Sequence, residues 1–374
     1  MLSICEDIVR CIGCCLSDKS KVRLIETCSV VNGFKHLFVF DKKVEFESIS
    51  NLSYYDQFLH VVFKKGEHRL PRRIEKIRYR VIDNYVLPYA THIHFAYYAD
   101  CYVPLPASVV SIELPDTFNS PPMKCESCTV PEICSHIPNT ITHLRFGTIF
   151  NRSIDSPNLT SLTHLTFGDC YNQPLDFNLF SSLTHLTFGS AFNQPIIGMS
   201  VLTKLTHLTF GVHFDQIVKD NIPESVTNLH FDRYFNQNID NCIPYSVTCL
   251  SFFGNFNKHV VGLPNTITHL SLRGEFNQTL TAMLPDSITH LTLGDRFNKP
   301  LNNSIPASVI CLTFGYDFNH PLAENDLINV QHVTFGVCFR QSLKNVRMPK
   351  MIYLTSSKRS SIADVPSHVI CNMV

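Results

Sequence analysis

The stretch SLTHLTFGSAFNQPI, Ser182–Ile196, recurs along the chain with few changes. The copy before it, SLTHLTFGDCYNQPL, covers Ser161–Leu175, and a later copy, SITHLTLGDRFNKPL, covers Ser287–Leu301. Aligned on the step apolar-x-apolar, ten copies follow one another at intervals of 20 to 22 residues. A unit this short cannot bury a core by itself, so the repeat predicts stacked coils that share one core.

The alternating Leu-x-Phe step predicts a short strand in each coil, with Leu and Phe pointing inward, and the stacked strands predict a parallel sheet. An aromatic residue always follows four positions after the second apolar residue, and we expect these rings to stack inside the array. Asn comes next in eight of the ten copies, where its amide can satisfy backbone groups of its own and the adjacent coil; Asp215 and Arg340 are the exceptions. The ten aromatic residues are Phe150, Tyr171, Phe192, Phe214, Phe235, Phe256, Phe276, Phe297, Phe318 and Phe339.

A histidine precedes the strand Leu in most copies, on the side of the strand that we expect to face outward. Two hypotheses fit such a column: a ladder that binds metal or senses pH, or a stack of polar rings that stay mostly neutral because close like charges oppose protonation. No carboxylate accompanies the column to orient metal ligands, which favours the structural hypothesis. The column consists of His143, His164, His185, His207, His269, His290 and His332.

The remaining outward positions are mostly Thr or Ser followed by Gly, which predicts a flat face. The departures near the middle of the array are His230, Asp232, Phe253 and Arg273. At its start, a weaker copy with Ile77 and Tyr79 as the strand residues places Lys76, Arg78 and Arg80 outward. Charged and aromatic residues on a concave face are typical specificity elements of a binding solenoid, so we predict that these seven contact a protein partner. Drift on a tolerant surface is the alternative.

The totals exclude several classes of protein. The 374 residues contain 31 Lys plus Arg and 31 Asp plus Glu, so no overall field attracts nucleic acid or membrane. The first residues lack the pattern of a secretory signal, and no run of about 18 apolar residues occurs. The 15 cysteines are therefore expected to be reduced, in a cytoplasmic protein.

The frame Ile-x-x-Leu-x-Phe resembles the leucine-rich repeat. With Phe-Asn-x-Pro-(Ile/Leu), as in Phe192–Ile196, it is similar to the FNIP repeat, a relative of the leucine-rich repeat that is abundant in social amoebae and giant amoebal viruses. The resemblance implies an interaction solenoid. For a viral protein, the expected compartment is the host cytoplasm. We place the solenoid at residues 70–360, with regular coils at about 136–345, an insertion at about 120–135 and a tail or cap at 361–374.

Residues 1–42 differ in pattern from the array. Apolar residues recur at helical spacing, and Ser17 or Asp18 can cap a second helix. The segment resembles an F-box, followed by a connector at 43–69. The resemblance implies binding to the Skp-type adaptor of a cullin ubiquitin ligase; the alternative is a helical cap on the first coil. The residues that would contact the adaptor are Ile4, Ile8, Ile12, Leu16 and Leu24.

Two other groups of residues suggest chemistry. Cys125, Cys128, Cys134 and His136 could hold zinc, although their spacing is unusual and thiols packed against the solenoid are the simpler interpretation. Residues 64–80 carry eight basic residues, but without interleaved aromatic residues they favour a solvated edge or an acidic protein partner over nucleic acid. No nucleotide fingerprint or nucleophile–base pair is present, so we expect neither an enzyme nor a cofactor.

The sequence thus predicts an α+β chain: a small helical F-box-like domain followed by a leucine-rich-repeat-like β-solenoid with a parallel sheet on its concave face. The function that follows is substrate recognition in an SCF-type cullin ubiquitin ligase, with the solenoid binding an unknown target protein. The alternative is a stand-alone interaction solenoid whose N-terminal helices only cap the array. We expect neither membrane nor nucleic acid as a partner.

Overall fold

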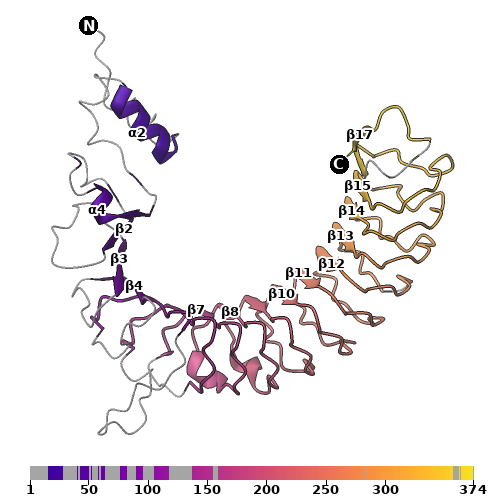
Figure 1. Cartoon of the computed structure of the whole chain (residues 1–374). Helices are drawn as coiled ribbons and strands as arrows, with labels where there is room; N and C mark the ends of the chain where they lie inside the picture. The colour runs from indigo at the N-terminus through magenta and orange to yellow at the C-terminus, as the bar shows by residue number, and fades with distance from the viewer. Residues whose placement is uncertain are drawn as a thin grey trace. The chain divides into compact units, whose positions relative to one another are not determined.

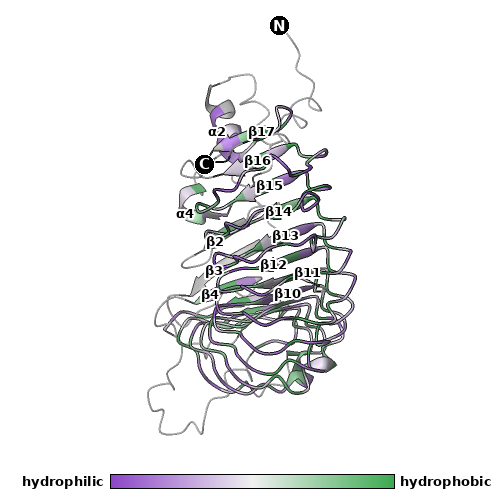
Figure 2. Cartoon of the chain, turned by 90° about the vertical axis from the view of Figure 1, so that its right-hand side faces the viewer, coloured by the Kyte–Doolittle hydropathy of each residue, from purple (hydrophilic) through white to green (hydrophobic). Residues whose placement is uncertain are grey.

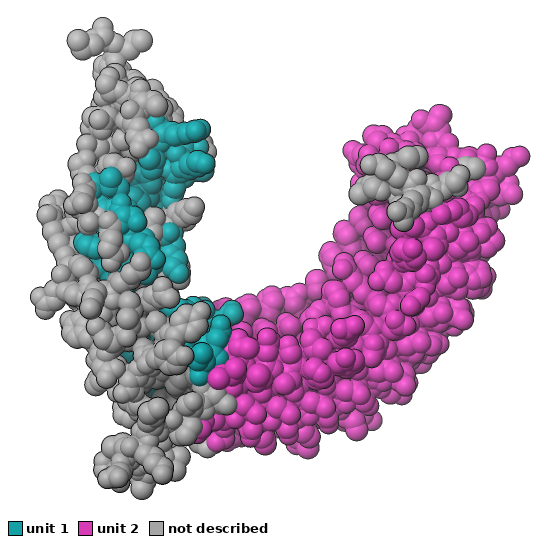
Figure 3. Space-filling view, viewed as in Figure 1, with its two compact units in different colours: residues 1–147, 156–159 teal, residues 148–155, 160–374 magenta. Residues whose placement is uncertain are grey.

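The computed structural model describes residues 16–27, 40, 43–49, 52, 58, 60–63, 76–81, 90–95, 105–117, 137–154, 159–281, 283–356, 362 and 364–373. The chain forms two compact units, shown in different colours in Figure 3. Unit 1 comprises residues 1–147 and 156–159, and unit 2 comprises residues 148–155 and 160–374. Within the described residues, no helix is long and apolar enough to cross a membrane.

Unit 2 is a stack of coils, each of which contributes one short strand to a parallel ladder on the inner side of its arc (Figure 1). Equivalent residues of neighbouring repeats pair in register, as in His185 with His207 and Leu186 with Leu208. The predicted parallel sheet is therefore confirmed; Figure 2 shows strands of the array lying one above another. The strands are β7 (His164–Thr166), β8 (His185–Thr187), β9 (His207–Thr209), β10 (Asn228–Phe231), β11 (Cys249–Phe252), β12 (His269–Leu272), β13 (His290–Leu293), β14 (Cys311–Thr313), β15 (His332–Phe335), β16 (Tyr353–Ser356) and β17 (Ile370–Met373).

The interior of unit 2 contains the predicted stack of aromatic rings. From Phe150 to Phe339, all ten rings are at most 1% exposed. Neighbouring rings lie between 5.9 Å (Phe150 to Tyr171) and 6.4 Å (Phe256 to Phe276) apart, centroid to centroid, and are nearly parallel. Each ring of this size buries about 150–250 Å², so the stack supplies much of the apolar burial of the array.

The residue after each ring forms the predicted ladder between coils. The side-chain oxygen of Asn172 accepts the backbone N–H of Asn193 at 2.9 Å, and that of Asn193 accepts the N–H of Asp215 at 2.9 Å. Asp215 continues the ladder, since its carboxylate accepts the N–H of Asn236 at 2.9 Å. The ladder therefore requires the acceptor oxygen of the side chain, which Asn and Asp share, and not the amide N–H.

Arg340 marks the last step of this ladder among the described coils. Its N–H still donates to the Asn319 oxygen at 2.8 Å, but its side chain has no acceptor for a further coil. The guanidinium instead donates to the carbonyl oxygens of Val337 and Phe339, at 2.6 and 2.8 Å. Both departures from the Asn pattern thus have a physical explanation.

The outer side of unit 2 is built from turns, as the short repeat requires. Prolines before the strands accept a hydrogen bond three residues on, as in Pro223 with the N–H of Val226 at 3.1 Å. Two short 3₁₀ helices occur in the described return segments: η5 (Phe177–Phe180), whose first turn is capped by Asp176, and η6 (Met199–Val201). A coil of 20 to 22 residues leaves no space for a longer helix.

Unit 1 has the same ladder of parallel strands, formed by β1 (Val44–Glu45), β2 (His60–Phe63), β3 (Lys76–Val81), β4 (His92–Phe95), β5 (Ser111–Glu113) and β6 (His143–Arg145). β1 and β2 lie in the segment predicted to be a connector, and β17 of unit 2 lies in the predicted tail. The ladder therefore extends beyond the predicted solenoid at both ends. Short helix α4 (Phe46–Ile49) packs on β2, with Phe46 stacked on Phe63 at 5.0 Å.

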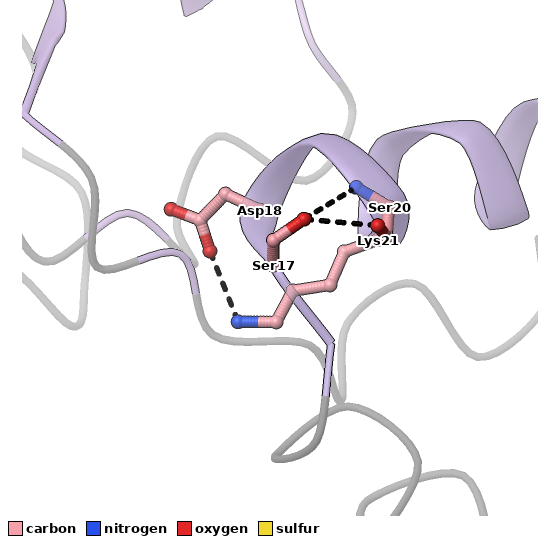
Figure 4. Close-up of polar contacts among 4 residues, drawn as sticks. All are labelled: Ser17, Asp18, Ser20 and Lys21. Carbon is pink, nitrogen blue, oxygen red and sulfur yellow. Dashed lines mark hydrogen bonds and ion pairs between the residues drawn. The ribbon is translucent and has the colours of Figure 1, made fainter. Parts of the chain in front are cut away.

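Within residues 1–42, the described part contains one helix, α2 (Asp18–Thr27), and so does not give the predicted two-helix domain. Ser17 caps this helix, as predicted: its hydroxyl oxygen accepts the N–H of Ser20 at 3.3 Å (Figure 4). Lys21 is buried and forms an ion pair with Asp18 at 3.0 Å. Its ammonium group also lies 5.8 Å from the ring centre of Phe40, which stacks on Phe58 at 4.6 Å.

Candidate functional site on the strand face of unit 2

We call the surface on the outward side of the strands of unit 2 the strand face. It is formed by the outward residues of each strand and by the residue directly after the second inward residue. In most coils that following residue is glycine, for a steric reason. A Cβ added to Gly189 would lie 2.0 Å from the carbonyl oxygen of Gly168, and one added to Gly211 would lie 2.0 Å from that of Gly189. These coils therefore present hydroxyl groups and bare backbone on the strand face.

Three consecutive coils carry a side chain at this position: Asp232, Phe253 and Arg273. In the last two, glycine comes one position later, at Gly254 and Gly274, where φ is +76° and +74°. The backbone hydrogen bonds between neighbouring strands also continue one residue further there, because the N–H of Phe253 donates to the carbonyl of Phe231 at 3.0 Å. Moving the glycine thus converts a flat stripe into a position that displays side chains.

We name His230, Asp232, Ser251, Phe253 and Arg273, which lie on the consecutive coils of strands β10 to β12, the central cluster. The rings of His230 and Phe253 lie 4.9 Å apart at 59°. The Arg273 guanidinium lies 5.1 Å from the Phe253 ring centre, a cation–π contact. The Nδ1 atom of His230 and the hydroxyl oxygen of Ser251 are 2.7 Å apart.

The charges of the central cluster are arranged along the array. Burial lowers the pKa of His230, and the nearby Asp232 carboxylate opposes this effect only in part. The imidazole is therefore neutral at pH 7, and Arg273, which is exposed, is the cation of the cluster. Phe253 lies between this cation and the histidine, so the cluster offers an apolar ring beside a positive charge.

Four of the seven predicted contact residues are thus brought together. The other three, Lys76, Arg78 and Arg80, occupy β3 in unit 1, where Arg78 is in register with His92 and Arg80 with His94. The predicted frame of this coil was wrong by two residues: Tyr79, not Ile77, is in register with Ile93 and, through it, with Ile112 and Leu144. A strand shifted by two keeps the same face inward, so the periodicity of two could not reveal the error.

Unit 1 has a polar contact that the sequence did not reveal. Glu113 on β5 lies between His94 on β4 and Arg145 on β6, with its carboxylate 3.1 Å from Nδ1 of His94 and 3.4 Å from Nε of Arg145. The hydrogen bond from His94 lowers the pKa of Glu113, and both positive neighbours add to the effect. His94, Glu113 and Arg145 directly follow Ile93, Ile112 and Leu144, which pair in register, so comparison of these three outward positions could have revealed the contact.

The histidine column of unit 2 is a stack of rings. His185 lies 4.2 Å from both His164 and His207, and His269 lies 4.3 Å from His290. The hydroxyl of Thr184 donates to the carbonyl of Thr163 at 3.0 Å, so Nδ1 of His185, 2.9 Å from that hydroxyl, carries the proton and donates to it. The Nε2 atom is then the unprotonated one; at His207 it accepts a hydrogen bond from the Asn228 amide at 2.7 Å.

This geometry supports the structural hypothesis for the column. Burial, followed by the neighbouring imidazoles, lowers the pKa of His185 and of His290, so both rings are neutral at pH 7. Stacked parallel rings direct their Nε2 lone pairs side by side rather than toward one point, which is unsuited to chelation. Among the described residues, no group of three His, Cys, Asp or Glu side chains could hold a metal ion.

Several of the predicted residues lie wholly or partly outside the described set. Ile4, Ile8, Ile12 and the cluster of Cys125, Cys128, Cys134 and His136 lie outside the described residues. Leu16 is half-buried just before α2, and Leu24 lies within α2, but its side chain is outside the described set.

Unit 2 also has a polar pocket of about 540 Å³ beside the ladder of asparagines. Arg296 crosses it, 3.7 Å from the carboxylate of Glu275 and 3.1 Å from that of Asp317. Asn257, Asn277 and Asn298 complete the lining. Arg296 thus pairs with both carboxylates, and no residue of the central cluster lines this pocket.

Comparison with known proteins agrees with this architecture. The FNIP repeat matches six overlapping segments of the chain, residues 171–213, 192–231, 214–256, 235–275, 255–294 and 276–317. Residues 171–317 are FNIP repeats. The central cluster lies within them.

Among solved structures, CroV588, described as a novel circular leucine-rich-repeat protein, is similar with 32% identity and a TM-score of 0.69. The match covers 89% of this chain and 50% of CroV588, so the chain spans half the length of that protein. The internalin InlF of Listeria monocytogenes is 12% identical with a TM-score of 0.48, over 71% of this chain and 80% of the internalin. We find no similar chain among curated proteins. The chain is a leucine-rich-repeat-like solenoid.

Proposed function

We propose that the chain binds a partner protein through the strand face of unit 2, with the central cluster as the main contact. The repeat solenoid is suited to protein–protein interaction, and it provides a long, ordered surface. The observation that supports this site is the replacement of glycine by Asp232, Phe253 and Arg273 in three consecutive coils. An aromatic ring with an arginine on one side is the composition typical of binding hot spots.

Site-specific photocrosslinking tests this proposal. A benzoylphenylalanine placed at Phe253 is expected to crosslink a partner protein in cells, whereas the same group at Tyr245 is not. Tyr245 is the matched control because it is 77% exposed but lies in the turn before β11, outside the strand face. Equal crosslinking at both positions, or none at Phe253, would contradict binding at the central cluster.

We further propose that the partner is a substrate of an SCF-type cullin ubiquitin ligase, and that residues 1–42 bind the Skp-type adaptor. The support is the F-box resemblance of the sequence together with helix α2, which begins at the predicted cap Ser17. In this role the chain catalyses nothing itself; it holds the target near the conjugating enzyme, in the cytoplasm or, for a viral protein, the host cytoplasm.

Binding to a purified Skp-type adaptor tests this role. We expect the wild-type chain to retain the adaptor, Leu16→Asp and Leu24→Asp to lose it, and Lys19→Ala, an exposed change on the same helix, to keep it. A circular-dichroism spectrum and melting curve identical to those of wild type show that the array of each variant is intact. A wild-type chain that retains no adaptor contradicts the proposal.

The second candidate is a stand-alone interaction solenoid whose N-terminal segment is a cap. The contact of Lys21 in α2 with Phe40, and of Phe40 with Phe58, favours this candidate, because it joins the helix to the start of the strand ladder. If the cap is the main role, Leu24→Asp lowers the stability of the chain rather than its retention of an adaptor.

A further inference from the structure

Arg273 is the exposed cation at the centre of the strand face. No carboxylate of the described residues lies within 4 Å of its guanidinium, unlike Arg296 and Arg145, which are paired. Its partner within the chain is the Phe253 ring, at 5.1 Å. The guanidinium therefore retains its capacity to donate several hydrogen bonds to an outside acceptor.

An acceptor bound to Arg273 would lie beside the Phe253 ring, because the guanidinium contacts this ring. The ring contacts Arg273 of the following coil and His230 of the preceding coil, and His230 is itself bonded to Ser251. Both neighbours restrict the rotation of the ring, so less conformational entropy is lost when a partner binds. A partner that reaches Arg273 passes next to an apolar surface.

The charges of the central cluster favour a partner group that carries a single negative charge. Asp232 lies two coils from Arg273, a separation of about 10 Å at about 4.8 Å per strand. A phosphoryl group carries close to two negative charges and is usually bound by several arginines. With one arginine and a carboxylate on the same face, the cluster matches a carboxylate better than a phosphate.

We propose that the protein partner presents an Asp or Glu side chain to Arg273 and an apolar side chain to Phe253. This inference rests on the proposed binding role of the strand face and adds the chemistry of the recognised segment: acidic, and adjacent to an apolar residue. Binding buries the carboxylate–guanidinium pair against the Phe253 ring, where solvent and salt screen it less.

Selection of peptides from a random displayed library of dodecamers on the full-length chain tests the proposal. We expect wild type to enrich peptides with Asp or Glu beside an apolar residue. A selected peptide is expected to bind Arg273→Gln about ten-fold more weakly, the effect of losing a hydrogen bond to a charged group. Lys204→Gln is the matched control, since it removes an exposed positive charge elsewhere in unit 2 and should leave the affinity unchanged.

Each result decides the inference. Acidic peptides that bind wild type and Arg273→Gln equally, or a wild-type selection without acidic enrichment, overturn it. If the selected peptides lack acidic residues but Phe253→Ala abolishes their binding, the strand face still binds proteins and only the acidic specificity is wrong. Peptides in which phosphoserine replaces the selected Asp or Glu, and which bind more tightly than the original peptides, would also overturn it. Unchanged melting temperatures show that the variants are folded.

Discussion

In the interior of unit 2 the coils from Phe150 to Phe339 each supply an aromatic ring and, up to Asn319, a side-chain oxygen, whereas on the strand face three of these coils differ from their neighbours. The interior rings from Phe150 to Phe339 are at most 1% exposed, and each contacts its copies in the adjacent coils. On the strand face, Asp232, Phe253 and Arg273 stand where the other coils of this set have glycine.

The difference follows from what each position contacts. An interior residue touches the same residue of the next coil, so one changed copy disturbs two contacts and its identity is held constant by packing. A strand-face residue touches solvent or a partner, and its identity is free to change once the backbone provides space for a Cβ. We therefore expect interior substitutions to reduce stability and strand-face substitutions to reduce binding.

The largest expected effect is on the ring stack. Phe214→Ala should lower the free energy of unfolding by about 3–5 kcal/mol, because the ring is fully buried between Phe192 and Phe235. Phe253→Ala, the same chemical change on the strand face, should cost about 1 kcal/mol or less. Denaturant unfolding followed by circular dichroism measures both. Equal losses would remove the distinction between interior and strand face.

The second-largest effect on stability is expected at the glycines of the strand face. Gly189→Ala places a Cβ about 2.0 Å from the carbonyl oxygen of Gly168, so neighbouring coils must separate, at a cost of about 1–3 kcal/mol. Arg273→Ala tests the equivalent position in a central coil and should change stability by about 0.5 kcal/mol or less. If both alanines are tolerated equally, the shift of glycine to Gly254 and Gly274 is not what makes room for side chains.

A smaller effect on stability distinguishes the side-chain oxygen of asparagine from its amide N–H. Asn172→Leu should cost about 1–3 kcal/mol, since the N–H of Asn193 loses its acceptor. Asn172→Asp should cost about 1 kcal/mol or less, because Asp215 already fills the same role in the next-but-one coil. The pair of unfolding curves provides the comparison, and an Asp as costly as Leu would show that the amide N–H is also required.

The smallest effect is a dependence on pH. The pKa of His185 is lowered in the folded chain, so near and below pH 6.5 the unfolded chain binds more protons at this residue than the folded chain does. Stability should therefore fall as the pH decreases from 7.5 to 5.5, and His185→Gln should lose less than wild type over this range. Denaturation midpoints at the two pH values provide the measurement; parallel losses would mean that the stack does not oppose protonation.

The regular coils show how much a sequence of this kind can predict. The spacing of 20 to 22 residues predicted the strands, the ring stack and the hydrogen bond of the Asn amide to the adjacent coil, because each of these contacts is made between identical positions of adjacent coils. The same periodicity singled out His230, Asp232, Phe253 and Arg273 as departures. Where the repeat is weak, around Ile77 and Tyr79, the predicted frame was wrong by two residues. The contact of Glu113 with His94 and Arg145 was missed although the three residues occupy equivalent positions of adjacent coils.

The sequence by itself determined the stack, since a side chain repeated at one interval must meet its own copies when the coils pile in register. Only the tertiary structure decided that Phe253 lies between His230 and Arg273, because these three belong to different coils and their contact depends on the extra ladder step and the positive φ of Gly254 and Gly274. It also decided the tautomer of the histidine column, which is set by threonine hydroxyls bonded to the preceding coil. Periodicity specifies which positions face each other, whereas the direction of a side chain on the open face is set by the backbone of each individual coil.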